Sequence, residues 1–428
     1  MIPEKILSEL IQINTSNPPG NETAAARYLA ELLQQVGIDC EIIEPAAGRG
    51  SLIARFGAGP RKLLYISHLD VVPAGDDWDF EPFSGKIEGG TIHGRGAIDC
   101  KDLAAAQVCA ALELAREGVS LNGELIIAAT ADEELGGELG AGYLTANCLE
   151  KIRADFAVNE GAPHPLLIKG QPLYFIQVGE KGTAWSKLTV RGVSCHGSMP
   201  ALGDNAVVRM SRAVAALAEY EPEIVLIPEL LALLRELSRI RGLEMEPTPD
   251  NIDELLEALE LERDFTEMLR AMTRMTISPN IIGGGVSTNI VPDLCESELD
   301  IRILPGQNAD YVLQELFKLL GAGVETVLTE YREPTFTSSQ TEPYRLMAGL
   351  TGELAGPGAV CLPIISTGST DSKYLREAGI PAYGIGHMAP DYDPAVSATM
   401  HGRNERIDIK SLRLKTDFLK ELARRYLA

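Results

Sequence analysis

The chain has 428 residues, 45% of them hydrophobic, and a formal net charge of -23 from 61 acidic and 38 basic residues. This length predicts two domains, and the lack of a long uncharged apolar run indicates a soluble globular protein without a membrane span. The negative charge excludes a nucleic acid as the expected partner, because a phosphate backbone would repel it. The seven cysteines are scattered and never form a CxxC pair, so we expect free thiols in a reducing cytoplasm.

The first part of the chain alternates between helical and strand patterns. Residues 2–13 have apolar side chains at helical spacing and lack the apolar core of a signal peptide, so they predict a helix that packs on the first domain. Further helices are predicted at 21–36 and 101–117, and strands at 40–43, 51–56, 123–130, 154–158 and in the run 62–73. Together they predict an α/β fold with a mixed, largely parallel sheet flanked by helices.

From about residue 179 the pattern changes to that of an inserted α+β unit. We therefore predict one domain from residues 1–178 and 333–428, and a second from residues 179–332. Residues 221–275 of the insert predict extra amphipathic helices with solvated acidic faces, and we assign them no catalytic role.

Candidate metal ligands follow several of the predicted strands. In the run 62–73, His68 and Asp70 lean to the same side of the strand end, because strand side chains alternate. This pair suits a metal ligand held by an acidic partner, and it equally fits a strand end capped by polar residues. Since ligand groups gather at the carboxyl ends of parallel strands, we group this pair with Asp99, Glu133, Glu134, Glu160 and His401.

Five carboxylates at one edge of a sheet would repel one another unless some were protonated or cations lay among them. Imidazole mixed with carboxylate suits zinc and its first-row neighbours better than calcium or magnesium, which favour oxygen alone. The alternative for the segment 131–134 is an ordinary acidic loop.

Eight stretches then occur in a fixed order between about residues 63 and 407. They are SHLDVVPAGDDWDFEPFSG, IHGRGAIDCKD, ATADEELGG, VNEG, GVSCHGSMP, STNIVPD, STGSTDSKYLREAGIPAYG and MHGRNERI. In these stretches the sequence resembles the co-catalytic zinc amidohydrolases, a family that includes aminoacylases, glutamate-releasing and vacuolar carboxypeptidases, acetylornithine deacetylase and succinyl-diaminopimelate desuccinylase.

The resemblance implies two divalent metal ions, zinc with cobalt or manganese as alternatives, and a metal-bridging water as the nucleophile. One ion would be held by His68, Asp99 and Glu160, and the other by Asp99, Glu134 and His401. Asp70 would fix the His68 ring, and Glu133 would be the general base. Asp102 departs from the small residue common in relatives, and we expect it to begin the helix 101–117. Cys100 is an alternative soft ligand.

The insert would act as a lid and dimerisation domain. His196 resembles a family histidine that reaches the partner subunit's metal centre and stabilises the oxyanion; ordinary loop packing is the alternative. Asn289 and Arg302 match positions that contact substrate, although Arg302 could equally be an exposed surface arginine. Gly368, Ser369 and Thr370 resemble a substrate-binding loop, and Thr370 or Asp371 could instead simply cap a helix.

We therefore expect a cytoplasmic, homodimeric, metal-dependent hydrolase that cleaves an amide or peptide bond next to a free carboxylate. Its substrate would be a small peptide or an N-acyl amino acid, as for aminoacylases, carboxypeptidases and dipeptidases. The first alternative is acetylornithine deacetylase or succinyl-diaminopimelate desuccinylase activity. The second is a non-catalytic metal-binding relative.

Overall fold

A computed structural model describes residues 2–428, which form two compact units. Of the described residues, the first unit comprises those up to Val178, Thr337–Ile364 and Thr370–Ala428, and the second comprises Gly179–Phe336 and Ile365–Ser369. Each unit has its own sheet order and its own buried core. None of the helices within residues 2–428 combines the length and the apolar character that crossing a membrane requires.

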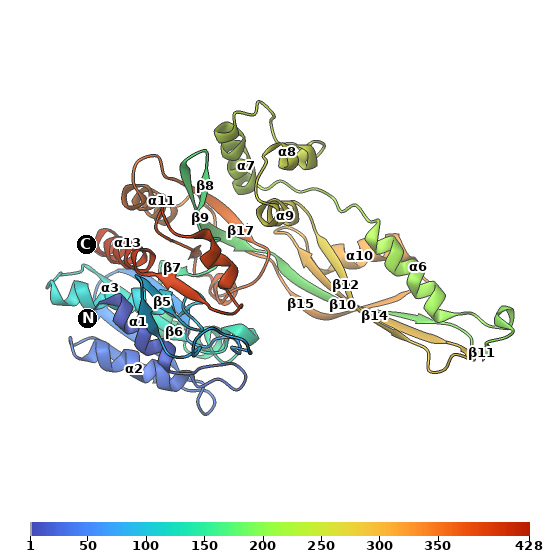
Figure 1. Cartoon of the computed structure of the whole chain (residues 1–428), viewed down its shortest axis with the longest axis horizontal. Helices are drawn as coiled ribbons and strands as arrows, with labels where there is room; N and C mark the ends of the chain where they lie inside the picture. The colour runs from blue at the N-terminus through green and yellow to red at the C-terminus, as the bar shows by residue number, and fades with distance from the viewer. Residues whose placement is uncertain (1) are drawn as a thin grey trace. The chain divides into compact units, whose positions relative to one another are not determined.

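The first unit contains a mixed sheet covered by helices (Figure 1). Its helices are α1 (Pro3–Gln12), α2 (Glu22–Gln34), α3 (Lys101–Arg116), α4 (Ala141–Asn147), α5 (Leu149–Ile152), α11 (Glu342–Ala355), α12 (Ser372–Glu377) and α13 (Ile409–Leu427), with short 3-10 turns η1 (Glu133–Leu135) and η3 (Pro394–Thr399). Its strands are β1 (Asp39–Ile43), β2 (Ser51–Gly57), β3 (Arg61–His68), β6 (Gly123–Thr130), β7 (Phe156–Asn159), β8 (Leu166–Ile168), β9 (Gln171–Glu180), β17 (Val360–Ser366) and β18 (Ala382–Ile385). The last two residues of β9 fall in the second unit and pair with β16 (Thr335–Phe336). A small separate sheet joins β4 (Lys86–Glu88), β5 (Thr91–His93) and β19 (Arg406–Asp408).

The main sheet has the strand order β1-β2-β6-β3-β7-β18-β9-β16, and β8 and β17 also pair with β9. Strand β3 runs parallel to β6 and β7, and β18 runs parallel to β7, whereas β1, β2 and β9 pair antiparallel with their neighbours. The parallel registers place the carboxyl ends of β3, β6 and β7 at the same edge of the sheet. The predicted mixed, largely parallel fold is therefore confirmed.

The residues of β3 alternate between two layers of helices. Leu64 and Ile66 belong to a buried cluster that includes Leu144 of α4 and Leu375 of α12. Tyr65 points the other way, and its hydroxyl donates to the Leu419 carbonyl oxygen of α13 at 2.5 Å. Both faces of this strand are buried, which explains why its sequence is a continuous apolar run rather than an alternation.

Asp102 forms a buried ion pair between helices α3 and α13. The Lys415 ammonium donates to Asp102 Oδ2, and these two residues are 5% and 0% exposed. Asp102 lies in the first turn of α3, as predicted. Its cationic partner therefore lies more than 300 positions away in the chain.

Replacing Lys415 with methionine is expected to lower the free energy of unfolding by about 3–5 kcal/mol, because Asp102 would keep a buried charge without its cation. The double variant Asp102→Leu/Lys415→Met should recover most of this loss, since neither charge is then buried. Urea unfolding followed by circular dichroism measures both values. A single variant as stable as the wild type would contradict the buried charge pairing.

The second unit is built on a four-stranded antiparallel sheet in the order β12-β14-β10-β15. Its strands are β10 (Gly182–Arg191), β11 (Cys195–His196), β12 (Thr276–Gly284), β13 (Ile290–Val291), β14 (Leu294–Ile303) and β15 (Glu325–Arg332), and β11 pairs with β13 as a separate short ribbon. Its helices are α6 (Ala206–Ala218), α7 (Pro228–Arg241), α8 (Ile252–Ala258), α9 (Arg263–Met272) and α10 (Ala309–Leu320), with a 3-10 turn η2 (Pro200–Leu202). Helices α7, α8 and α9 occupy the region where extra helices were predicted.

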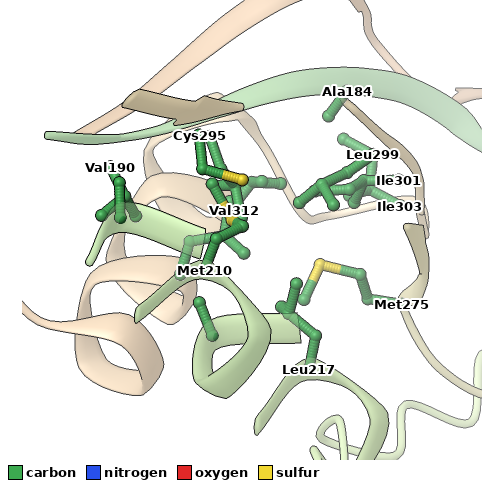
Figure 2. Packing of buried hydrophobic residues seen from close by; sticks show 14 residues of the cluster. Ala184, Val190, Met210, Leu217, Met275, Cys295, Leu299, Ile301, Ile303 and Val312 are labelled. Atoms are coloured by element: carbon green, nitrogen blue, oxygen red, sulfur yellow. The ribbon is translucent and has the colours of Figure 1, made fainter. Parts of the chain in front are cut away.

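Alternation along β14 creates the core of the second unit. Leu299 and Ile301 are buried, whereas Glu298 and Asp300, which alternate with them, lie on the opposite face. Met210 of α6 packs against this buried face, together with other apolar side chains of the same cluster (Figure 2). The period-two pattern of the strand and the helical period of α6 thus bury one common surface.

Candidate metal centre

Two groups of candidate ligand atoms in the first unit share Asp99. Asp99 Oδ1 lies 3.0 Å from His68 Nε2, and Asp99 Oδ2 lies 2.9 Å from His401 Nε2. Glu134 Oε2 lies 3.3 Å from the same His401 nitrogen. Each oxygen of one carboxylate therefore faces a different histidine, as a carboxylate that bridges two sites would do.

These side chains come from four different segments. His68 is the last residue of β3, Glu134 lies in η1 shortly after β6, and Asp99 lies two residues before α3. His401 follows η3 and is the one exposed member, with 52% of its side chain accessible. The parallel strands thus supply two members at the carboxyl edge of the sheet, and two loops supply the others.

Asp70 links His68 to the turn that carries the two glutamates. Its carbonyl oxygen lies 3.0 Å from His68 Nδ1, and its carboxylate Oδ1 lies 3.5 Å from the same nitrogen. The carboxylate instead accepts the backbone N–H groups of Glu133 and Glu134, both at 3.1 Å, and the Asn17 amide at 2.9 Å. Asp70 contacts the far nitrogen of His68 as expected, but more closely with its main chain than with its carboxylate.

The charges of this cluster influence one another strongly. Burial opposes ionisation of Asp70, yet contact with His68 and the surrounding donors outweighs burial and lowers the pKa of its carboxyl group. Hydrogen bonds to Asp99 and Glu134 raise the pKa of His401 to about 10. Burial, with repulsion from Glu160 and other acids, raises the pKa of Glu133 well above its ordinary value.

The donor set fits divalent ions of the zinc type. Imidazole nitrogens and carboxylate oxygens converge within 4.8 Å, a combination that zinc and its first-row neighbours accept. Glu134 Oε1 is buried, and among residues 2–428 no group donates a hydrogen bond to it. Such a buried acceptor without a donor is uncommon in folded proteins. A cation would compensate it and reduce the repulsion that raises the pKa of Glu133.

In one group of converging ligand atoms the third residue is Cys100, the alternative soft ligand, and not Glu160 as expected. Within residues 2–428, the two groups of three or more converging ligand atoms are His68, Asp99 and Cys100, and Asp99, Glu134 and His401. Glu160 follows β7 and belongs to neither group, although its charge acts on Cys100 and Glu133. The Cys100 sulfur also accepts a hydrogen bond from the His68 backbone N–H at 3.3 Å, and burial raises the pKa of the thiol.

Two charged networks around the cluster were not predicted from the sequence. Arg49 bridges Glu22 and Asp132, with contacts of 2.8 and 2.7 Å, directly before the turn that carries Glu133. Arg95 pairs with Glu405 at 2.6 Å beside Asp99. Both arginines lie far from their partners in the sequence, so no spacing rule reveals these pairs. For Arg95 and Glu405, the charges of GRG and NER within the motif stretches were the available signal.

The loop 368–371 directly precedes α12. Thr370 Oγ1 accepts the Ser372 backbone N–H at 3.1 Å, which is a capping contact of the kind considered for this residue. Asp371 accepts the Thr130 hydroxyl at 2.7 Å, and burial raises its pKa to about 6. Gly368 and Ser369 group with the second unit.

The remaining candidates lie in the second unit. His196 is exposed on β11, where its Nδ1 lies 2.8 Å from Ser198 Oγ. Asn289 lies beside it, because the Gly197 N–H donates to the Asn289 carbonyl oxygen at 2.7 Å. These two predicted residues therefore share one end of the unit.

Arg302 lies on the half-exposed face of β14. Its Nε donates to Asp300 Oδ1 at 2.7 Å, and its Nη1 donates to Thr183 Oγ1 at 3.1 Å. The guanidinium group is thus paired within its own sheet, and any carboxylate it bound would compete with Asp300.

An α/β sheet with imidazole and carboxylate ligands around a shared aspartate is the architecture of metal-dependent hydrolases. A family model described as Peptidase family M20/M25/M40 matches residues 64–425, and the chain belongs to this family. The resemblance found in the sequence is therefore confirmed.

Individual relatives span almost the whole chain. Aminoacylase-1 of Sus scrofa is 24% identical over 98% of this chain and 94% of that protein. Succinyl-diaminopimelate desuccinylase of Parvibaculum lavamentivorans is 28% identical over 100% of this chain and 96% of that protein.

Solved structures show the same fold. The M20 family metallo-carboxypeptidase Sso-CP2 from Sulfolobus solfataricus is similar with a TM-score of 0.72 and 23% identity, covering 98% of both chains. The YXEP protein of Bacillus subtilis, described as a dinuclear metal binding peptidase from the M20 family, gives a TM-score of 0.61 and 14% identity over 99% of this chain and 98% of that one.

Proposed function

We propose that the protein is a metal-dependent hydrolase that cleaves an amide or peptide bond next to a free carboxylate, as aminoacylases, carboxypeptidases and dipeptidases do. The main observation in support is that the two carboxylate oxygens of Asp99 lie 3.0 and 2.9 Å from the Nε2 atoms of His68 and His401. This geometry supports a site formed by Asp99, Glu134 and His401. For the other site it supports His68 and Asp99, and we propose Glu160 as the third ligand because the family resemblance implies it. Two divalent ions there, zinc or else cobalt or manganese, would polarise an amide carbonyl and acidify a water molecule.

Glu133 is the proposed general base. Its backbone N–H is fixed by Asp70, and its neighbour Glu134 faces His401, so one glutamate of the pair is left for proton transfer. A carboxylate in this position can take a proton from a metal-bound water and deliver it to the leaving nitrogen. Asp70 contributes by orienting both the His68 ring and the η1 turn.

The second unit would supply substrate contacts and the dimer interface. Strand β12 is an edge of its sheet, and its Ile281 and Ile282 are 58% and 55% exposed. An exposed apolar edge strand suits pairing with a second copy of the chain, which supports a homodimer. We propose that the partner's His196 stabilises the oxyanion, and that Asn289, Arg302, Gly368, Ser369 and Thr370 bind substrate.

These assignments make residues 1–178 and 333–428 the catalytic domain and residues 179–332 the lid and dimerisation domain. The free cysteines support a cytoplasmic location. Acetylornithine deacetylase or succinyl-diaminopimelate desuccinylase activity is the second candidate, because a desuccinylase is among the relatives that match the full chain. A non-catalytic metal-binding role is disfavoured, because the proposed base lies beside the ligand cluster.

A substrate panel tests this proposal. We expect hydrolysis of dipeptides and N-acyl amino acids, and a kcat/KM at least about 10²-fold lower for the matching C-terminal carboxamides, because a site built for a carboxylate rejects its neutral analogue. Activity should disappear in excess chelator and return with zinc, cobalt or manganese. Turnover restricted to N-acetylornithine or succinyl-diaminopimelate would select the second candidate, and full activity in chelator would contradict metal dependence.

A further inference from the structure

Arg95 and Glu405 form a buried ion pair in the first unit that the proposed mechanism does not use. The Arg95 Nη1 atom donates to Glu405 Oε2 at 2.6 Å, and the two residues are 1% and 0% exposed. They belong to separate segments, one before α3 and the other before β19. Because burying two charges is costly, a pair of this kind needs further hydrogen bonds to be tolerated.

Those hydrogen bonds connect Glu405 to the loop that ends in Asp99. Its Oε2 accepts the Gly96 N–H at 3.0 Å, and its Oε1 accepts the N–H groups of Ile98 at 2.9 Å and Asp99 at 3.3 Å. One carboxylate thus fixes the backbone of residues 96–99, including that of the aspartate shared by the two ligand groups.

The other nitrogen of Arg95 reaches the segment of the second histidine. Arg95 Nη2 donates to the Gly402 carbonyl oxygen at 2.9 Å and to the His401 carbonyl oxygen at 3.3 Å. His401 has a φ of 55°, in the left-handed region that residues other than glycine rarely adopt, so its backbone needs support from its surroundings. Arg95 provides this support while its first nitrogen holds Glu405.

We infer that Arg95 and Glu405 are positioning residues that set the separation of Asp99 and His401. Arg95 thereby sets the affinity of the Asp99–Glu134–His401 site for its divalent ion, and Glu405, which holds the loop of the shared Asp99, affects both sites. This inference rests on the proposed function, since it takes those three residues as ligands. The guanidinium fork is essential because its two nitrogens serve the two loops at once, whereas a lysine ammonium offers a single centre.

Arg95→Lys separates this role from general stability. The lysine can keep the ion pair with Glu405 but loses the second arm to residues 401 and 402. Zinc titration of the full-length, metal-stripped chain against a chromophoric chelator should show one of two ions weakened about 10–100-fold, the usual effect of removing a group that orients a ligand. The other ion should keep its affinity within about threefold, and His401→Ala identifies which step belongs to which site.

Arg55→Lys is the matched control. Arg55 also pairs with a glutamate, Glu124 at 3.3 Å, and with a carbonyl oxygen, that of Lys151 at 2.7 Å, but it touches neither ligand loop. Its variant should bind both ions as the wild type does. Two unchanged steps in Arg95→Lys, or two steps weakened equally, would overturn the inference.

Glu405→Gln provides a second test should Arg95→Lys fail to fold. It preserves the size of the side chain but removes its charge, and both ions should weaken because Asp99 serves both sites. Wild-type affinity for both ions in this variant would overturn the inference. A wild-type chain that binds fewer than two zinc ions would instead contradict the proposed function itself, so the two failures are distinguishable.

Discussion

Glu133→Gln is expected to lower kcat by about 10²- to 10⁴-fold while two metal ions stay bound. Glutamine has nearly the same shape, but its amide cannot accept the proton that the attacking water must lose. The backbone N–H of residue 133 would still donate to Asp70, so the η1 turn and Glu134 should keep their places. Steady-state kinetics with an N-acyl amino acid and metal analysis of the same sample measure the two quantities.

Glu138→Gln is a suitable control, because Glu138 is an exposed acid five positions further along the same segment. Its kcat should remain close to that of the wild type. An active Glu133→Gln enzyme would contradict the proposed base. Loss of one ion together with activity would show that Glu133 coordinates metal rather than transferring a proton.

The sequence predicted those parts of the fold that are encoded locally. Strands β3, β6 and β7 are short apolar runs that stop at polar residues, and their parallel pairing brings His68, Glu134 and Glu160 to the same edge of the sheet. The extra helices of the insert were also predicted, because amphipathic spacing is a short-range signal. Where burial determines the spacing of the apolar residues, the sequence of a single segment is enough to predict its helix or strand.

Strand β9 and its partners were not recognised. It pairs locally with β8, and also with β18 and β16, which follow it by more than 150 residues, so its place in the sheet depends largely on distant neighbours. The charged residues that support the site were not predicted either, because their partners are also distant in the sequence. Glu405 acts on residues 96–99, and Lys415 pairs with Asp102, across about 300 residues of sequence.

For Glu160, the sequence predicted the position of the segment but not that of the carboxylate. The sequence places it directly after β7, at the predicted sheet edge, yet its carboxylate lies outside both groups of converging ligand atoms in the described chain. A glutamate side chain has three rotatable bonds, and the sequence cannot specify its rotamer. The segment was predictable, but the direction of the side chain was not.

Mixed dimers of two inactive variants should recover activity. His196→Ala is expected to lower kcat by about 10²- to 10³-fold through loss of an oxyanion donor. If the partner's His196 completes each site, a heterodimer of the His196→Ala and Glu133→Gln chains contains one intact site, formed by Glu133 of the first chain and His196 of the second. Random mixing should then restore about a quarter of wild-type activity, since half of the dimers are heterodimers with one working site.

Co-expression of the two chains with different affinity tags allows the heterodimer to be purified and assayed directly. A mixture of His196→Ala with a doubly substituted Glu133→Gln/His196→Ala chain is the control, because it contains no intact His196 and should stay inactive. Activity in the control would show that His196 is dispensable. An inactive heterodimer of the single variants would place His196 and Glu133 in the same subunit's site, because only donation across the dimer combines the intact residues of two different chains.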